Sequence, residues 1–258
     1  MDRVDLQGNR LEVQYIGGPS HPGALAPLVF LHEGLGSCAM WRNWPHAVCR
    51  ATGRAGWVYS RRGYGLSDPV ADVRQHGRLR PDYLHREAFQ VLPALLAELA
   101  VHRPVLLGHS DGASIALLHA SRFPLRACIV MAPHVMVEEV SIRSIEAARV
   151  AYLHGALRAR LERYHADVDG AFWQWNDIWL SPGFRNFDIR QDCTRITCPV
   201  QAIQGLDDPY GTLAQIEQID LPADRITRVV LPACGHSPHR EAAQETLGHI
   251  TTFLSRIT

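Results

Sequence analysis

The 258-residue chain contains no lysine, so all 26 of its strongly basic residues are arginines. It therefore has no side-chain amine that could form a Schiff base with a carbonyl substrate or bind phosphate as a P-loop lysine does. The 26 acidic residues balance the arginines, and the formal net charge is zero. This balance gives no electrostatic reason to expect nucleic acid or an anionic membrane surface as a partner.

Several motifs of cofactor chemistry are also missing. The sequence has no H-E-x-x-H, no C-x-x-C and no G-x-G-x-x-G, so neither a metal nor an organic cofactor is expected. No apolar run approaches the length of a membrane span. Residues 1–5 include two aspartates, and no apolar segment typical of a signal peptide follows them. We therefore expect a cytoplasmic protein with no membrane partner.

The chain has six cysteines, and several of them fall in segments that read as core strands or helices. They are Cys38, Cys49, Cys128, Cys193, Cys198 and Cys234. This placement favours reduced, mostly buried thiols in the cytoplasm, and disulfides are the minority alternative that an even count leaves. The composition does not decide between a monomer and a homo-oligomer, which stays open.

Apolar runs that read as strands alternate with segments of helical spacing. Strand patterns occupy residues 27–32, 57–60, 105–107, 127–132, 199–204 and 227–231, and residues 10–16 alternate like an edge strand with one wet face. Helical spacing covers about 39–51, 81–100, 241–256 and the stretch after Ser110, with Pro93 an objection to the second of these. The alternation predicts an α/β fold with a mostly parallel central sheet and helices on both faces.

The alternation stops between residues 135 and 197, where the pattern is helical and rich in arginine and aromatic residues. We therefore predict one α/β core made of residues 1–134 and 198–258. Residues 135–197 form a helical insertion over the top of the sheet. Residues 17–27 are expected to be a turn-rich connection.

A candidate nucleophile lies at the bend between a predicted strand and a predicted helix. Residues 108–112 read Gly-His-Ser-Asp-Gly and fit the G-x-S-x-G pattern. Such an elbow exposes the serine hydroxyl where backbone N–H groups open a helix, and its glycines permit the tight turn. The strand before Ser110 and the helix after it supply the context that the motif requires.

A serine needs a base, and the base needs an orienting carboxylate. His236 follows a glycine directly beyond a predicted strand, and His239 is its rival. The acid is Asp208 or, failing that, Asp207, after the strand that ends at Gln204. Other histidines read as surface residues, namely His46, His85, His154 and His165. For an oxyanion, the candidate donors are the backbone N–H groups of Asp111 and Gly34.

Five motifs in this order resemble the α/β-hydrolase superfamily, over nearly the whole chain. Residues 31–37 are similar to its H-G-x-G loop and residues 60–67 to its D-x-R-G-x-G-x-S loop. Residues 108–112 match its elbow, residues 205–208 its G-x-x-D loop, and residues 235–236 its terminal G-H. The resemblance implies a Ser110–Asp208–His236 triad, an oxyanion hole at Gly34 and Asp111, and a helical cap over 135–197.

Two positions depart from the family pattern. Glu33 replaces the glycine that follows His32, and Asp111 follows the nucleophile where many relatives have an uncharged residue. Two carboxylates beside the site would disfavour anionic substrates unless Arg61 or Arg62 offsets them.

Aromatic residues of the predicted cap are candidates for an acyl pocket. Phe172, Trp173, Trp175 and Trp179 either line this pocket or anchor the cap to the core. Trp41 is in the same way either a pocket wall or a core residue.

The sequence thus predicts a carboxylesterase-like serine hydrolase. Its expected substrate is a small or medium carboxylic ester, thioester or lactone, cleaved through an acyl-enzyme on Ser110. A C–C bond hydrolase of the meta-cleavage product type would use the same triad and is the alternative. A noncatalytic ligand-binding relative is a third hypothesis. Dehalogenases and epoxide hydrolases of the family use a carboxylate where Ser110 stands, so both are disfavoured.

Overall fold

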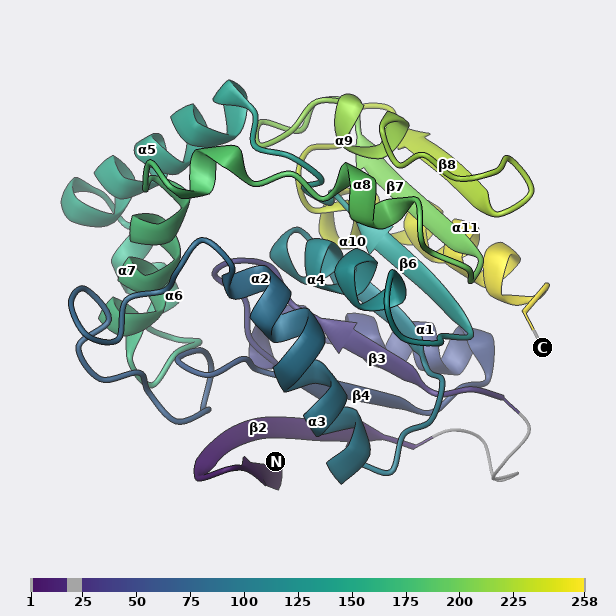
Figure 1. The fold of residues 1–258 in the computed structure, drawn as a ribbon, viewed down its shortest axis with the longest axis horizontal. Coiled ribbons are helices and arrows are strands. Elements are labelled where there is room, and N and C mark those ends of the chain that lie inside the picture. Colours follow the sequence, from purple (N-terminus) through teal and green to yellow (C-terminus); the bar gives the residue numbers. More distant parts are fainter. Residues whose placement is uncertain (1, 18–24, 258) are drawn as a thin grey trace.

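The computed structural model describes residues 2–17 and 25–257 (Figure 1). Met1 and most of the predicted connection at 17–27 lie outside the described residues. One eight-stranded sheet has the order β1-β2-β4-β3-β5-β6-β7-β8. Its strands are β1 Asp2–Leu6, β2 Asn9–Ile16, β3 Leu28–Leu31, β4 Gly56–Tyr59, β5 Val105–His109, β6 Ala127–Met131, β7 Val200–Gly205 and β8 Ile226–Leu231. The strands from β4 to β8 pair in parallel, which confirms the α/β fold class.

The edge of the sheet differs from the prediction. β2 does not form the edge, because β1 pairs antiparallel with it from Asp2–Val13 to Leu6–Asn9. The connecting turn consists of Gln7 and Gly8, whose φ angles are 57° and 83°. Two residues with positive φ make the type of turn that suits the twist of a hairpin. Glutamine is an unusual residue for this conformation, so the sequence did not signal the turn.

Helices cover both faces of the sheet, as Figure 1 shows. Val29 and Leu31 of β3 face one core with α2 (Tyr83–Arg86), α3 (Leu92–Glu98), α4 (Asp111–Ala120) and α8 (Arg190–Cys193). Leu28 and Phe30 point to the opposite face and pack with α1 (Trp44–Thr52) and α11 (Ala243–Leu254). Alternate side chains of one strand therefore enter two cores, which explains its continuous apolar sequence.

The long helix expected at 81–100 is divided. Between α2 and α3, residues Glu87–Val91 form a π-helical segment (η2). Pro93 then lies in the first turn of α3 and has no N–H to donate to the preceding π-helical segment. A wider turn before the proline lets the chain continue in the same direction.

Most of the helices between β6 and β7 stand to one side of the sheet, at the left of Figure 1. We call the residues between these strands the helical insertion. It comprises α5 (Glu139–His154), α6 (Leu157–Leu161), α7 (Val168–Trp179), the 3-10 turn η3 (Phe184–Asn186) and α8. Tyr152 of α5 stacks on Phe172 of α7 with ring centroids 3.6 Å apart. The apolar faces of α5 and α7 are thus buried against each other.

The remaining elements are short, namely η1 (Ala39–Trp41), α9 (Ala214–Glu217) and α10 (Pro238–Glu241). All six cysteines are buried, as their sequence context predicted. Over residues 2–17 and 25–257, every helix is too short or too polar to cross a bilayer.

Candidate active site

Ser110 occupies a strained bend between β5 and α4. Its backbone has φ 52° and ψ −119°, a conformation that is costly for a residue with a side chain. A Cβ on Gly112 would lie 2.1 Å from the carbonyl oxygen of Leu31, and one on Gly108 would lie 2.3 Å from that of Gly112. The two glycines therefore let the elbow pack directly against β3 and α4.

The structure brings Ser110, His236 and Asp208 together, although they come from loops far apart in the sequence. Nε2 of His236 lies 3.0 Å from the hydroxyl oxygen of Ser110. Nδ1 of His236 lies 2.9 Å from both carboxylate oxygens of Asp208. Because a carboxylate only accepts, Nδ1 carries the hydrogen and Nε2 is free to accept the serine proton.

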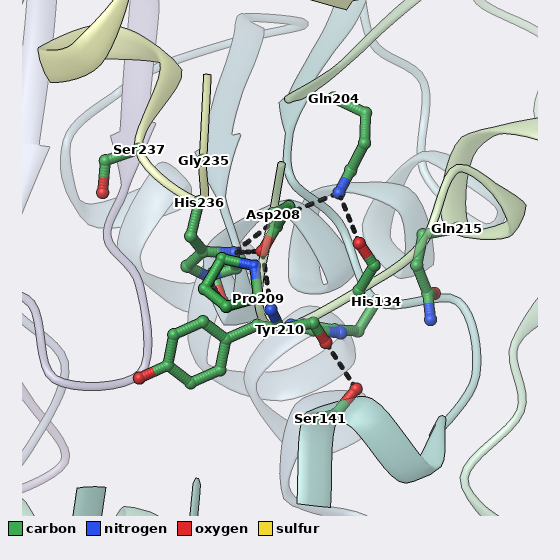
Figure 2. Close-up of polar contacts among 12 residues, drawn as sticks. His134, Ser141, Gln204, Asp208, Pro209, Tyr210, Gln215, Gly235, His236 and Ser237 are labelled. Carbon is green, nitrogen blue, oxygen red and sulfur yellow. Dashed lines mark hydrogen bonds and ion pairs between the residues drawn. The ribbon is translucent and has the colours of Figure 1, made fainter. Parts of the chain in front are cut away.

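Two further groups fix the carboxylate of Asp208, and Figure 2 shows them converging on it. The side-chain amide of Gln204 donates to it at 2.7 Å and the backbone N–H of Tyr210 at 2.8 Å. Burial alone would raise the pKa of Asp208, but the hydrogen bond and charge of His236 and the Tyr210 N–H outweigh it and the pKa is lowered. The Tyr210 ring lies 4.6 Å from the His236 ring. Sequence reasoning missed Gln204, although it lies at the end of β7 just before Asp208.

The two rival residues are placed elsewhere. Asp207 is exposed, and its backbone N–H donates to Cys234. His239 is 4 % exposed in α10 and packs against Trp41, with ring centroids 4.9 Å apart. Neither side chain contacts Ser110. Asp208 and His236 are therefore the pair that the loops present to the serine.

A second histidine, His109, holds the backbone of His236 in place. Nε2 of His109 lies 2.7 Å from the carbonyl oxygen of His236, so this nitrogen carries the hydrogen. Its Nδ1 lies 3.5 Å from the carboxylate of Glu33. Burial would raise the pKa of Glu33, but the neighbouring His109 and the charge of Arg240 hold it well below its ordinary value. An ionised carboxylate therefore stands beside the site, on the loop that leads to Gly34.

The carbonyl oxygen of Glu33 accepts three hydrogen bonds. The donors are Nδ1 of His32 at 2.7 Å, the Arg61 guanidinium at 3.0 Å and the N–H of Gly36 at 3.0 Å. Because a trans peptide is planar, a carbonyl fixed on one side directs the following N–H, that of Gly34, to the opposite side. Burial and the charge of Arg61 lower the pKa of His32 well below its ordinary value, so His32 stays neutral and donates only from Nδ1.

Gly34 itself lies against the helical insertion. A Cβ at this position would be 2.1 Å from Nε1 of Trp175. Gly34, Asp111 and Ser110 line the same cavity. Both backbone segments therefore border the space in which an oxyanion at the serine would form.

The side chain of Asp111 is buried, and its carboxylate accepts two hydrogen bonds. It accepts from the hydroxyl of Tyr83 at 2.7 Å and from Nε1 of Trp179 at 3.2 Å. The Arg61 guanidinium lies 3.9 Å away. Burial raises the pKa of Asp111, while Arg61 and these two donors limit the rise. Arg61, and not the exposed Arg62, is thus the cation that offsets this carboxylate.

The cavity above Ser110 has a volume of about 200 Å³. Trp175 and Trp179 line it, as expected, together with Glu33. Its other lining residues, which sequence reasoning did not single out, are Leu35, His109, His134, Ile145, Tyr210 and Ser237 beside the residues already described. Burial lowers the pKa of His134 to about 3, so this side chain carries no positive charge at neutral pH.

Three expectations about aromatic residues and histidines need correction. Trp41 lies beneath the site in the core of α1 and α11 and not in the cavity wall. Trp173 turns away from the cavity, and the guanidinium of Arg74 covers its ring at 4.1 Å. His165 is buried, where it accepts from the N–H of Gly65 at 3.0 Å and meets the carbonyl of Leu35. A polar ring that satisfies two backbone groups of packed loops is not a surface residue.

Over residues 2–17 and 25–257, no group of three or more histidine, cysteine, aspartate or glutamate side chains is arranged to hold a metal ion. The serine, imidazole and carboxylate form a hydrogen-bonded series that can move a proton without one.

A profile described as the alpha/beta hydrolase family matches residues 28–248. A search of curated proteins gave no match.

Solved structures match over almost the full chain at low identity. A structure from work on carboxylesterases of Nitrososphaera gargenis has a TM-score of 0.75 and 19% identity and covers 99% of this chain and 98% of that one. The enol-lactonase from Burkholderia xenovorans has a TM-score of 0.72 and 19% identity, covering 98% and 100%. The proline iminopeptidase from Mycobacterium smegmatis has a TM-score of 0.69 and 18% identity, covering 99% and 97%. At these identities the likeness shows the fold alone.

Proposed function

The chain belongs to the alpha/beta hydrolase family, and on that premise we propose that it is a serine hydrolase of small or medium carboxylic esters, thioesters or lactones. The observation that carries the proposal is the 3.0 Å contact between the Ser110 hydroxyl and His236, with Asp208 on the far side of the ring. A hydroxyl with a base in hydrogen-bond reach is an activated nucleophile for acyl transfer.

In the proposed reaction Ser110 attacks the substrate carbonyl while Nε2 of His236 takes its proton. Asp208 stabilises the imidazolium and holds the ring in place. The backbone amides of Gly34 and Asp111 donate to the tetrahedral oxyanion. His236 then gives the proton to the leaving oxygen or sulfur, and water cleaves the acyl-enzyme by the same steps in reverse order. No cofactor takes part in this sequence.

Three features favour an ester-type substrate. The nucleophile is a hydroxyl, which suits acyl chemistry better than epoxide opening or dehalogenation. The cavity is small, about 200 Å³, and its apolar wall of Ile145, Trp175 and Trp179 suits a short acyl group. Proteins described as carboxylesterases and as an enol-lactonase share the fold. The buried thiols favour a reducing compartment, so we propose the cytoplasm as the location.

A fluorophosphonate probe tests the proposal directly. We expect one label per chain, located at Ser110 by peptide mass spectrometry, and no label on the Ser110→Ala variant. His236→Gln should fold and label far more slowly. Labelling that persists in Ser110→Ala, or none in the folded wild type, would contradict the assignment.

A substrate panel then separates the candidate activities. It compares 4-nitrophenyl esters of increasing acyl length, thioesters, lactones and vinylogous 1,5-diketones. We expect turnover of short acyl esters, lost in Ser110→Ala. Turnover of the diketones alone would favour the C–C hydrolase, and labelling without turnover of any substrate would favour a ligand-binding role.

A further inference from the structure

A second cavity lies away from Ser110, between the loop that follows β4, the segment of α2 and η2, and α7. Its volume is about 460 Å³. The residues that line it are Arg61, Arg62, Tyr64, Val70, His76, Gly77, Arg78, Leu79, Arg80, Tyr83, Arg86, Glu87, Val91 and Gln174. None of them lines the cavity above Ser110. We call this second space the arginine cavity.

The charge around the arginine cavity is strongly unbalanced. Five arginines line it against one carboxylate, that of Glu87, although the formal net charge of the chain is zero. Some arginines elsewhere on the surface are paired with carboxylates, as Arg158 is with Asp169, but no other cavity described here is lined by several arginines. The concentration of positive charge is therefore a local property of this wall and not a consequence of overall composition.

Most of these guanidinium groups are available to a ligand. Arg62, Arg78, Arg80 and Arg86 are exposed, and in the described part of the chain none of the four forms an ion pair. Arg61 is different, because its guanidinium is engaged by the carbonyls of His32 and Glu33. Its charge also offsets the carboxylate of Asp111, so Arg61 is not free to bind a ligand.

A buried polar group of the wall is also without a partner. Gln174 of α7 is 2% exposed, and its side-chain Nε2 has no hydrogen-bond acceptor. A buried N–H group left unpaired costs free energy, which an acceptor oxygen in the cavity would recover. An amide donor and several guanidinium groups together match a ligand that offers acceptor oxygens and negative charge.

We propose that the arginine cavity binds a small organic anion through carboxylate or phosphate oxygens. A planar guanidinium pairs with two oxygens of either group in fork geometry, which gives such a site both affinity and orientation. Arg78 and Arg80 are separated by one residue on the same loop and face the cavity together with Arg86. The inference concerns a site apart from Ser110 and does not rest on the proposed hydrolase activity.

Calorimetric titration of the full chain with two probes tests the proposal. Citrate represents carboxylates and inorganic pyrophosphate represents phosphates. We expect at least one to bind with a dissociation constant below about 1 mM at low salt, and more weakly as the salt concentration rises. Binding of citrate alone or of pyrophosphate alone supports the site and shows whether it prefers carboxylate or phosphate oxygens. A dissociation constant above about 10 mM for both probes would overturn it.

Two double variants locate the binding. Arg78→Gln/Arg80→Gln should weaken the better probe at least about tenfold, because each lost pair is a charge-assisted hydrogen bond. Arg50→Gln/Arg160→Gln removes the same charge from exposed positions outside the cavity and should keep wild-type affinity within about twofold. Equal weakening in both variants would show a nonspecific charge effect and reject the site.

Gln174→Met removes the buried amide at nearly constant volume and leaves every arginine in place. We expect weaker binding of the same probe by about threefold or more, with a melting temperature near that of the wild type. If the double variant proves unstable, Arg78→Gln alone gives the same comparison. Unchanged affinity in both single variants would contradict the proposal.

Discussion

The guanidinium of Arg61 donates to the carbonyl oxygen of Glu33 at 3.0 Å. That carbonyl belongs to the peptide whose N–H, on Gly34, faces the site in the proposed mechanism. The arginine is buried, and its other terminal nitrogen donates to the carbonyl of His32 at 2.6 Å. Arg61 therefore acts as a positioning residue that fixes the plane of one peptide bond.

We expect Arg61→Lys to lower kcat roughly ten- to a hundredfold with little change in KM, because a mispositioned oxyanion donor weakens only the transition state. Steady-state kinetics on a 4-nitrophenyl ester measures both constants. Arg50→Lys, an exposed arginine that lines neither cavity, is the matched control and should behave as the wild type. A change confined to KM would refute the positioning role.

Replacing Asp208 with asparagine should reduce kcat by about four orders of magnitude, because the amide no longer orients the imidazole for proton transfer. Asp207→Asn, one residue earlier and exposed, should retain most of the wild-type rate. Comparable losses in the two variants would mean that the loop as a whole, and not this carboxylate, matters.

The carboxylate of Glu33 should make the enzyme prefer uncharged substrates to anionic ones. Because its pKa is held well below its ordinary value, it is ionised at neutral pH and repels anionic substrates. We expect Glu33→Gln to raise kcat/KM for an anionic ester, such as mono-4-nitrophenyl succinate, about tenfold relative to 4-nitrophenyl butyrate. The ratio of the two substrates is the quantity to measure, since it cancels general damage. An unchanged ratio would rule out this role.

The lowered pKa of His134 should account for part of the pH dependence of the free energy of unfolding. Its pKa is about 3 in the folded chain against an ordinary 6.5, so below pH 6.5 the unfolded chain takes up a proton that the folded chain does not. The free energy of unfolding is therefore unaffected by His134 above pH 6.5. As the pH falls below 6.5, protonation of His134 in the unfolded chain lowers this free energy by up to about 1.4 kcal/mol per pH unit. His134→Gln should flatten the decline of unfolding free energy between pH 6.5 and 5 in urea titrations. His46→Gln, exposed on α1, should leave the slope as it is.

Two glycine substitutions should change stability in opposite directions. Gly112→Ala would place a Cβ 2.1 Å from a backbone oxygen of β3, and a backbone atom cannot rotate away. We expect a loss of at least about 2 kcal/mol. Gly248→Ala lies in α11 with nothing within 4 Å of the new atom and should stabilise the chain by about 1 kcal/mol. Thermal or urea unfolding decides both signs.

The residues that the sequence predicts best are those tied to the ends of strands. The elbow at Ser110 and the loops at Asp208 and His236 follow apolar runs directly, and parallel strands present their carboxyl ends at one edge. Local pattern and topology are enough to place such residues together. The same reasoning gave the sheet and the helices on its two faces.

The supporting contacts could not be predicted in this way. Arg61 and Glu33 are 28 residues apart, and no pattern reveals which carbonyl a guanidinium will meet. The aromatic residues of the sequence also do not show which side chains point into the cavity. Trp173 and Trp175 lie on the same helix, and only Trp175 lines the cavity. Direction depends on how α7 rotates against the sheet, which side-chain packing decides.

The hydrogen bond from Trp179 to Asp111 joins the helical insertion to the residue beside the nucleophile. A hinge motion that swung α7 outward would remove one donor from a buried carboxylate, an expensive change in a dry interior. We therefore expect α7 to keep its contact with Asp111 while a substrate enters, and the width of the substrate to limit its access to Ser110.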